Sequence, residues 1–238
     1  MRTAPRFLLA VTLFATTSCS LWQPIADSEW RTEVPDGIND RFLDPALDPD
    51  EWLNRWEVES REIYTSRHAI LAAVGLKAGD RVADIGAGTG LFVAPFAQSV
   101  SAAGKVYALE ISPGFVSHLR DRVAREQLAN VEVILSQEAS TTLPPASVDV
   151  VFLCDTYHHF EHYRKMLASI RQTLRPGGQV VVIDFERIPG VSREWILGHV
   201  RAGKPQVIDE FTAAGFVLTA EISVAGLEEN YCLRFTRP

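Results

Sequence analysis

The sequence predicts an α/β fold in which a mostly parallel sheet is covered by helices on both faces. Three observations support this fold class. From residue 81 onward, short apolar runs of strand length alternate with longer segments of helical periodicity. Several of the runs are almost continuously apolar, as in strands buried on both faces. A glycine-rich turn joins the first run to the helical segment after it, which is typical of a strand–turn–helix unit in a parallel sheet.

The elements follow one another in a regular order. A first helix is expected over Glu51–Val74, with Gly75 as its C-terminal cap. Seven strands are expected, and their predicted ranges are Arg81–Ile85, Lys105–Glu110, Val131–Leu135, Val148–Cys154, Gln179–Ile183, Phe216–Ser223 and Tyr231–Phe235. The later helices are predicted over Leu91–Val100, Pro113–Leu128, Tyr163–Leu174 and Pro205–Ala214. Ser112 and Pro113 have the N-cap and N1 chemistry that begins a helix.

The N-terminal segment is typical of an export signal. Arg2 and Arg6 precede a short apolar run, Phe7–Ala15, which is too short to span a membrane. Small residues and Cys19 follow, so residues 1–19 are expected to be a signal peptide, either of the lipoprotein type, with Cys19 lipidated, or simply cleaved. Residues 20–50 are expected to form a linker or an N-terminal arm, and residues 51–238 the folded domain. The predicted location is exported: periplasmic, or anchored to the membrane as a lipoprotein.

The acidic composition argues against one class of partner, nucleic acid. The 238 residues carry a formal net charge of -7, and nucleic-acid-binding domains usually present a basic face. We therefore expect no nucleic acid partner. The remaining cysteines, Cys154 and Cys232, lie in apolar strands and are expected to be buried.

The glycine turn predicts the type of ligand. In "VADIGAGTGLF" the spacing is G-x-G-x-G, whereas a dinucleotide-binding turn has G-x-G-x-x-G. Asp84 stands just before the turn, where a carboxylate would repel a pyrophosphate but suit a cation. Glu110 ends the second strand, where a carboxylate accepts hydrogen bonds from ribose hydroxyls. The pattern therefore favours a nucleoside that carries positive charge.

Four segments, "VADIGAGTG", "VYALEIS", "VDVVFLCDTYHHF" and "LRPGGQVVVIDF", occur in an order that resembles the class I S-adenosylmethionine-dependent methyltransferases. The sequence is most similar to an exported bacterial subgroup with the TYHHF motif. The resemblance implies a Rossmann-like, seven-stranded, mostly parallel sheet and S-adenosylmethionine as cofactor. The cofactor-binding residues that it implies are Asp84, Gly86, Gly88, Gly90, Glu110, Gln137, Glu138 and Asp155. In place of the usual acid that contacts adenine the chain has "SQEAS", so Gln137 or Glu138 is expected to take that role.

The histidine-rich segment after the fourth strand has three interpretations. His158 and His162, with Cys154 or Asp155, are spaced for a shared metal ion, but a second recognisable ligand group is missing, and we expect no metal. The histidines are otherwise structural, or Tyr157 or His158 contacts the methyl acceptor. We favour the last interpretation and take Tyr157 and His158 as the candidate catalytic residues.

Methyl transfer is an in-line displacement that depends mainly on alignment and exclusion of water. The segment Phe185–Lys204 is rich in arginine and aromatic residues, which suits an anionic small-molecule acceptor, although such arginines are equally compatible with surface ion pairs. Two other functions stay open: an exported protein that binds a nucleoside-type ligand without turnover, and an NAD-dependent oxidoreductase, which the glycine spacing and Asp84 disfavour.

Overall fold

The computed structural model describes residue 1, residues 34–35 and residues 37–238. The predicted signal peptide and Cys19 lie outside the described residues, as does most of the first half of the predicted linker. Within the described part of the chain, no helix combines the length and the apolar character that a membrane span requires.

A seven-stranded sheet forms the centre of the molecule, with strand order β3-β2-β1-β4-β5-β7-β6. Its strands are β1 (Arg81–Ile85), β2 (Lys105–Glu110), β3 (Val131–Leu135), β4 (Val148–Cys154), β5 (Leu174–Phe185), β6 (Val217–Glu221) and β7 (Asn230–Thr236). The neighbouring pairs from β3 to β5 are parallel, and β7 is antiparallel to both β5 and β6. The predicted α/β fold and mostly parallel sheet are therefore confirmed.

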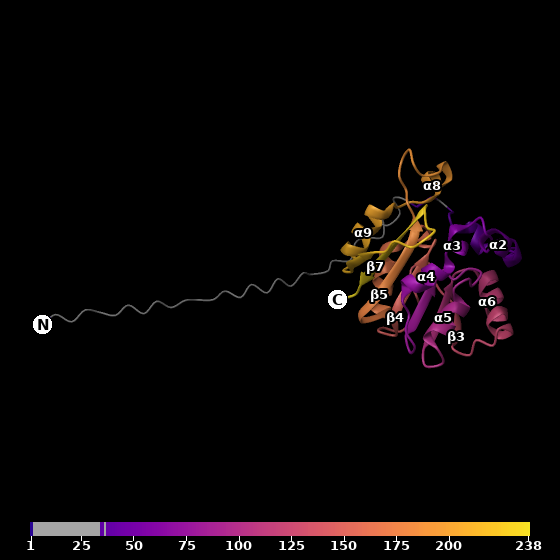
Figure 1. Cartoon of the computed structure of the whole chain (residues 1–238), viewed down its shortest axis with the longest axis horizontal. Coiled ribbons are helices and arrows are strands. Elements are labelled where there is room, and N and C mark those ends of the chain that lie inside the picture. Colours follow the sequence, from indigo (N-terminus) through magenta and orange to yellow (C-terminus); the bar gives the residue numbers. More distant parts are fainter. Residues whose placement is uncertain (2–33, 36) are drawn as a thin grey trace.

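Helices cover both faces of this sheet, as Figure 1 shows. They are α1 (Asp40–Leu43), α2 (Pro49–Trp56), α3 (Glu62–Thr65), α4 (Arg67–Val74), α5 (Val93–Val100), α6 (Pro113–Arg125), α7 (Tyr163–Thr173), α8 (Glu194–His199) and α9 (Lys204–Ala213), together with a 3-10 turn η2 (Tyr157–His159). Side chains along β4 alternate between the two faces of the sheet and contribute to a separate apolar core on each face. Val151 and Leu153 pack with α7 and α9, whereas Val150 and Phe152 pack with α4 and α5.

The predicted first helix, Glu51–Val74, is wrong as a single element. It is divided into α2, α3 and α4, with a break at residues 57–61. The break separates two groups of apolar side chains with different destinations. Trp52 and Trp56 pack against Phe115 of α6, whereas Ile63 and Ile70 join the core beneath the sheet. A continuous helix would not direct both groups to these surfaces.

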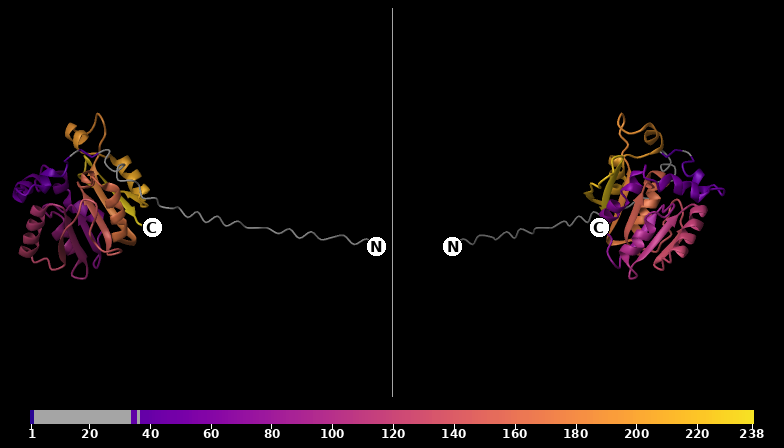
Figure 2. Two further views of the ribbon diagram at one scale, coloured as in Figure 1. Left: turned by 180° about the vertical axis from the view of Figure 1, so that it is seen from behind. Right: turned by 45° about the vertical axis from the view of Figure 1, so that its right-hand side comes forward.

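Residues 37–61 form the N-terminal arm, which packs over the sheet edge where the parallel strands end. The described part of the segment predicted as a linker or an arm, from residue 37 to residue 50, contacts the folded domain. Phe42 of α1 contacts Trp52, Trp56 and Phe115, with ring centroids 5.0, 6.1 and 6.5 Å away. Figure 2 shows that α8 and the N-terminal helices lie at the same end of the molecule. This end therefore brings together the beginning and the later part of the described chain.

Candidate active site

A cavity lies at the carboxyl ends of β1 and β4, where the strand order reverses direction. Ligands of open α/β sheets bind at this type of position, because the loops on either side diverge there. The cavity is lined by the glycine turn, by the end of β2, by η2, by α8 and by the N-terminal arm. Sequence-distant segments therefore form a single site.

The glycine turn adopts a conformation that favours glycine. Gly86 has φ +75° and Gly88 has φ +54°, both in the left-handed region, and both residues line the cavity. A Cβ atom at Gly86 would lie 2.6 Å from Oγ1 of Thr156. Gly90 has another role, since a Cβ atom there would lie 2.8 Å from Leu119 of α6. Gly90 thus permits close helix packing beside the turn.

Two buried carboxylates flank the turn. Oε2 of Glu110 accepts a hydrogen bond from the Gly88 N–H at 3.0 Å, and Oε1 accepts from Ile111 and Ser112 at 2.8 and 2.9 Å. Burial raises the pKa of Glu110, although these N–H groups oppose the shift. Burial, together with the charge of Glu110, raises the pKa of Asp84 to about 7. Both side chains line the cavity, where a cationic or hydroxyl-bearing ligand would compensate for their burial.

The shifted pKa of Asp84 predicts a pH-dependent stability. The ordinary pKa of this group is 3.8, so between about pH 4 and pH 7 the folded protein retains a proton that the unfolded chain has released. The free energy of unfolding is therefore expected to decrease as pH rises through this window. Urea titrations of the ligand-free protein at about pH 5 and about pH 8 measure the decrease, which Asp84→Asn should reduce.

The exposed Asp209 supplies the control, because Asp209→Asn should leave the pH dependence unchanged. Burial also raises the pKa of Asp155, to about 6, so part of the decrease should persist in Asp84→Asn. A pH dependence that is identical in Asp84→Asn and in the natural sequence would contradict the prediction.

Only some residues of the segment after β3 line the cavity. Ser136 and Glu138 line the cavity, whereas Gln137 is exposed and bonds through its backbone to Ser140. Of the two residues expected to take the adenine contact, Glu138 therefore has the suitable position. Opposite it, Trp56 stacks on Phe115, with ring centroids 5.5 Å apart, and both rings line the cavity.

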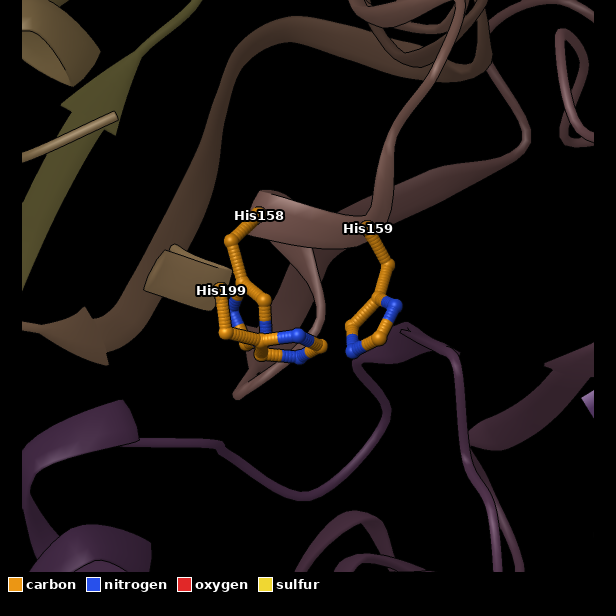
Figure 3. Close-up of side chains that lie close together, drawn as sticks. All are labelled: His158, His159 and His199. Carbon is orange, nitrogen blue, oxygen red and sulfur yellow. The ribbon is translucent and has the colours of Figure 1, made fainter. Parts of the chain in front are cut away.

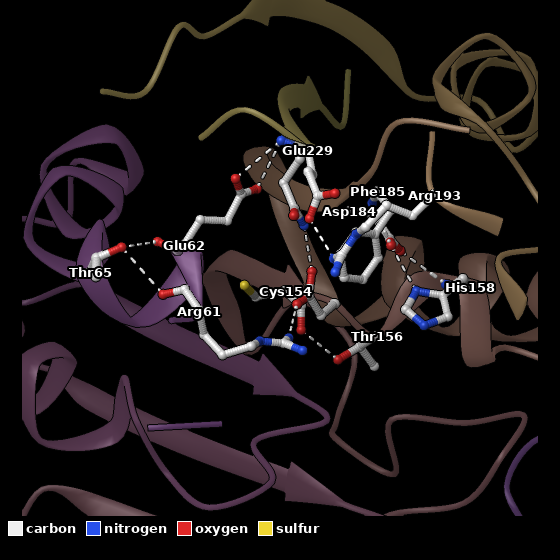
Figure 4. Close-up of polar contacts among 12 residues, drawn as sticks. Arg61, Glu62, Thr65, Cys154, Thr156, His158, Asp184, Phe185, Arg193 and Glu229 are labelled. Carbon is white, nitrogen blue, oxygen red and sulfur yellow. Dashed lines mark hydrogen bonds and ion pairs between the residues drawn. The ribbon is translucent and has the colours of Figure 1, made fainter. Parts of the chain in front are cut away.

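Asp155 follows β4 and is held by two partners. Its carboxylate pairs with Arg61 of the arm at 2.9 Å and accepts from Nδ2 of Asn230 at 2.5 Å. Its φ of +49° is unusual for a residue with a side chain. Figure 4 shows the neighbouring connection, in which Glu62 accepts from the backbone of Glu229. Asp155 lines the cavity as expected, and its carboxylate also fastens the arm to the sheet.

His158 is buried and oriented by Asp184, a residue at the end of β5 (Figure 4). Oδ1 of Asp184 lies 2.7 Å from Nδ1 of His158, and Oδ2 accepts from the His158 backbone N–H at 3.0 Å. Because Nδ1 faces Asp184, Nε2 is left for other partners, and the ring lines the cavity. This carboxylate–imidazole arrangement fixes the orientation of a functional histidine.

His159 and His199 lie beside His158, with ring centroids 4.3 and 5.2 Å from it. Burial, together with the neighbouring imidazoles and Arg41, lowers the pKa of His159. Burial, His158 and Arg41 lower the pKa of His199 to about 4. Both rings are therefore neutral near neutral pH. His162, in contrast, lies at the N-cap of α7 and does not join this group.

Tyr157 faces the core. It is fully buried, its hydroxyl donates to Oε2 of Glu210 at 2.5 Å, and Arg201 lies over its ring at 4.9 Å. Tyr157 is not among the residues that line the cavity. This position argues against the expected contact between Tyr157 and an acceptor, because the hydroxyl is buried and already bonded to Glu210.

The position of Tyr157 predicts a structural phenotype. Tyr157→Phe removes one hydrogen bond to a carboxylate that Arg201 still binds at 2.8 and 2.9 Å. We expect the free energy of unfolding to fall by about 1–3 kcal/mol, with ligand affinity unchanged. Urea unfolding and calorimetric titration measure the two quantities. Unchanged stability with a large loss of turnover would instead place Tyr157 at the acceptor.

The arginines of the segment Phe185–Lys204 are mostly neutralised. Arg193 pairs with Glu229 at 2.5 Å, and buried Arg201 with Glu210, so the ion-pair interpretation applies to both. The arginines that line the cavity are Arg41 and Arg61 of the arm. Arg61 is paired with Asp155, so positive charge beside the site comes from Arg41, in another part of the chain than the segment expected to supply it.

The comparisons with known proteins agree with this geometry. Residues 83–182 match the family described as a methyltransferase domain. A ubiquinone/menaquinone biosynthesis C-methyltransferase UbiE of Hydrogenovibrio crunogenus is 31% identical over 123 residues, which are 51% of this chain and 48% of that protein. The corresponding protein of Pseudomonas putida is 29% identical over 114 residues, 48% of this chain and 44% of its own length. The chain thus spans about half the length of these relatives.

Solved structures match over a greater length. A methyltransferase of Aquifex aeolicus, described as dependent on S-adenosylmethionine, superposes with a TM-score of 0.69 at 24% identity over 81% of this chain and 100% of that one. The chain has the class I methyltransferase fold. A [4+2]-cyclase, SpnF, shares this methyltransferase fold with a TM-score of 0.64 at 17% identity, over 77% of this chain and 85% of its own. The fold alone therefore does not define the reaction.

Several residues at the cavity of this methyltransferase fold were not among the site residues predicted from the sequence. Asp184 is an isolated acid at the end of an apolar strand, and this pattern was a usable signal. Trp56 and Arg41 come from the arm, and only tertiary packing brings them to the cavity. Their positions have no signature of local spacing.

Proposed function

We propose that this chain transfers a methyl group from S-adenosylmethionine to a small-molecule acceptor by in-line displacement. One observation carries the proposal. Two buried carboxylates, Asp84 and Glu110, flank a glycine turn and share a cavity with the oriented imidazole of His158. The methyltransferase domain match and the shared fold support S-adenosylmethionine as the cofactor.

The residues present fit such a cofactor. In the described part of the chain, Asp84 is a cavity-lining carboxylate to which no side chain donates, so an ammonium group would be a suitable partner. Glu110 retains acceptor capacity for ribose hydroxyls beside its three N–H donors. Trp56 and Phe115 offer apolar surface for a planar base, and Glu138 lies near enough to line the same cavity.

The cofactor, when bound, supplies an electrophilic methyl group. The tasks of the chain are to align the acceptor and to exclude water, and both depend on the aromatic arm on one side and α8 on the other. His158, held by Asp184, faces the acceptor side and offers the lone pair of its second ring nitrogen there. Arg41 supplies positive charge there, so the acceptor we propose is anionic.

Calorimetric titration of the full chain with S-adenosylhomocysteine tests the cofactor site. We expect binding that Glu110→Ala weakens at least about tenfold, which corresponds to about 1.4 kcal/mol. Glu132→Ala is the matched control, since Glu132 lies on β3 and pairs with Lys105 at 3.2 Å. Absence of binding by folded protein would overturn the proposal.

Turnover separates an enzyme from a binding protein. Release of S-adenosylhomocysteine from S-adenosylmethionine in the presence of mixed anionic acceptors would support methyl transfer. Tight binding without release from any acceptor would instead favour the alternative, a nucleoside-type binding protein on the same fold.

Export is a further part of the proposal. The sequence features of residues 1–19 support a signal peptide: two arginines, a short apolar run, small residues and Cys19. We propose a periplasmic location or attachment to a membrane through a lipidated Cys19. Cell fractionation, with Cys19→Ala beside the natural sequence, distinguishes the two locations.

A further inference from the structure

Three imidazoles meet at the acceptor side of the cavity. We propose that the histidine cluster, His158, His159 and His199, binds a divalent transition metal ion such as Zn²⁺. Figure 3 shows the three rings side by side, two from η2 and one from the end of α8. Their potential ligand atoms all lie within 4.8 Å of one another. From the sequence we expected no metal, because a second ligand group at a recognisable spacing is missing; His199 lies 40 residues beyond His159 and is brought to the cluster by the fold.

The distances require only small movements of the rings. Tetrahedral zinc with Zn–N bonds of about 2.0–2.1 Å places two ligand nitrogens about 3.4 Å apart. The potential ligand atoms of the three rings lie within 4.8 Å of one another, and rotation about the side-chain bonds can shorten these separations. The cluster is therefore close to a chelating arrangement.

A carboxylate behind His158 is the second observation. Asp184 is buried, and its Oδ1 lies 2.7 Å from Nδ1 of His158. Metal-binding histidines usually donate their second ring nitrogen to such a carboxylate, which sets the tautomer and increases the basicity of the ligand nitrogen. Nδ1 of His159 is buried without a hydrogen-bond partner in the described residues, so it also has an unused lone pair or proton.

The charges around the cluster decide what else the metal would bind. Arg41 is positive and lies in the same cavity, which opposes a bare cation, whereas Asp184 favours one. An anionic ligand between Arg41 and the metal would balance the site. Three protein ligands leave at least one coordination position open, as in catalytic zinc sites.

This open position points to the class of acceptor, and here the inference rests on the proposed function. A hydroxyl or thiol that coordinated a metal held by these histidines would lose its proton to solvent, because the metal would lower its pKa. A lone pair on this oxygen or sulfur would then form the bond to the methyl carbon. The bond from that carbon to the cofactor sulfur would break with its electron pair moving to sulfur, so that S-adenosylhomocysteine would be the product.

Metal titration of the full chain tests the site without any cofactor. After removal of metal by a chelator, Zn²⁺ is titrated in competition with a chromophoric chelator, and Co²⁺ is used to detect visible d–d absorption. We expect one Zn²⁺ per chain, and we expect His159→Ala and His199→Ala each to weaken binding about 10-fold or more. His199 is half-buried at the end of a short helix, so its replacement should leave the fold intact, which circular dichroism checks.

Two other histidines provide controls. His162 lies in the same loop and His68 on α4, both outside the cluster. His162→Ala and His68→Ala should therefore keep the Zn²⁺ affinity of the natural sequence. Arg41→Gln should tighten Zn²⁺ binding, because it removes the opposing charge. Absence of 1:1 binding, or binding that is equally strong in His159→Ala and His199→Ala, would overturn the metal site.

The cofactor site is tested separately. His199→Ala should bind S-adenosylhomocysteine as the natural sequence does, since the carboxylates Asp84 and Glu110 are unchanged. A failed metal titration together with intact cofactor binding would overturn this inference alone. Metal binding without cofactor binding would overturn the proposed function and leave the metal site standing.

Discussion

Replacement of Asp184 by alanine is expected to lower the free energy of unfolding by about 3–5 kcal/mol. The carboxylate is buried and accepts three hydrogen bonds. They come from Nδ1 of His158 at 2.7 Å, from the His158 backbone at 3.0 Å and from the Phe185 backbone at 2.8 Å. Alanine leaves all three polar groups buried without this partner. Urea unfolding at constant pH measures the loss.

His158→Ala is the matched comparison. It removes the imidazole but leaves both backbone N–H groups with Asp184, so it should cost less, about 1–3 kcal/mol. Asp184→Asn keeps one accepting oxygen and should fall between the two. Equal losses in Asp184→Ala and His158→Ala would show that the carboxylate does not organise the turn η2. Turnover and Zn²⁺ affinity should fall in all three variants, since each disturbs His158.

Gly86→Ala is the second change with a large expected effect. Alanine at φ +75° costs about 1–2 kcal/mol, and the contact of its Cβ with Thr156, 2.6 Å from Oγ1, adds about 1–3 kcal/mol. The turn must shift to relieve this contact. Because Gly86 lines the cavity, we expect the affinity for S-adenosylhomocysteine to fall at least about tenfold as well, measured by calorimetry.

Gly177 allows the two causes to be separated. It has φ +76°, and a Cβ atom there would meet no atom within 4 Å. Gly177→Ala should therefore show the backbone cost alone and leave ligand affinity unchanged. Addition of Thr156→Ala to Gly86→Ala should recover part of the lost stability. If Gly86→Ala is no less stable than Gly177→Ala, the proposed contact with Thr156 is not important.

The strands could be predicted from sequence because their signal is local. The bounds of β1, β2, β3 and β4 agree with the predicted ranges, since each is a short apolar run between polar turns. β5 extends beyond its predicted range, to Leu174–Phe185, because pairing with β4 and β7 continues past the apolar centre. The break between α2 and α4 had no local signal, because it depends on contacts such as the Arg61–Asp155 ion pair.

The residues of the candidate site also fall into those with a local sequence signal and those that depend on tertiary packing. The glycine turn, Asp84 and Glu110 were predictable, because their roles depend on position within one strand–turn–helix unit. The proximity of His199 to His158 was not, because it requires the packing of α8 against β5, where Trp195 and Phe185 have ring centroids 5.0 Å apart. Tyr157 was misleading for a related reason. Its place after the fourth strand suggested contact with the methyl acceptor, but Glu210 and Arg201 hold it in the core.

The N-terminal arm also bears on how such a protein can diverge. Residues 37–61 supply Asn39, Arg41, Phe42, Trp56 and Arg61 to the cavity, yet they precede the segment 83–182 that matches the methyltransferase domain. The arm contributes no strand to the sheet. Ligand preference can therefore change through the arm while the glycine turn and its carboxylates are inherited without change.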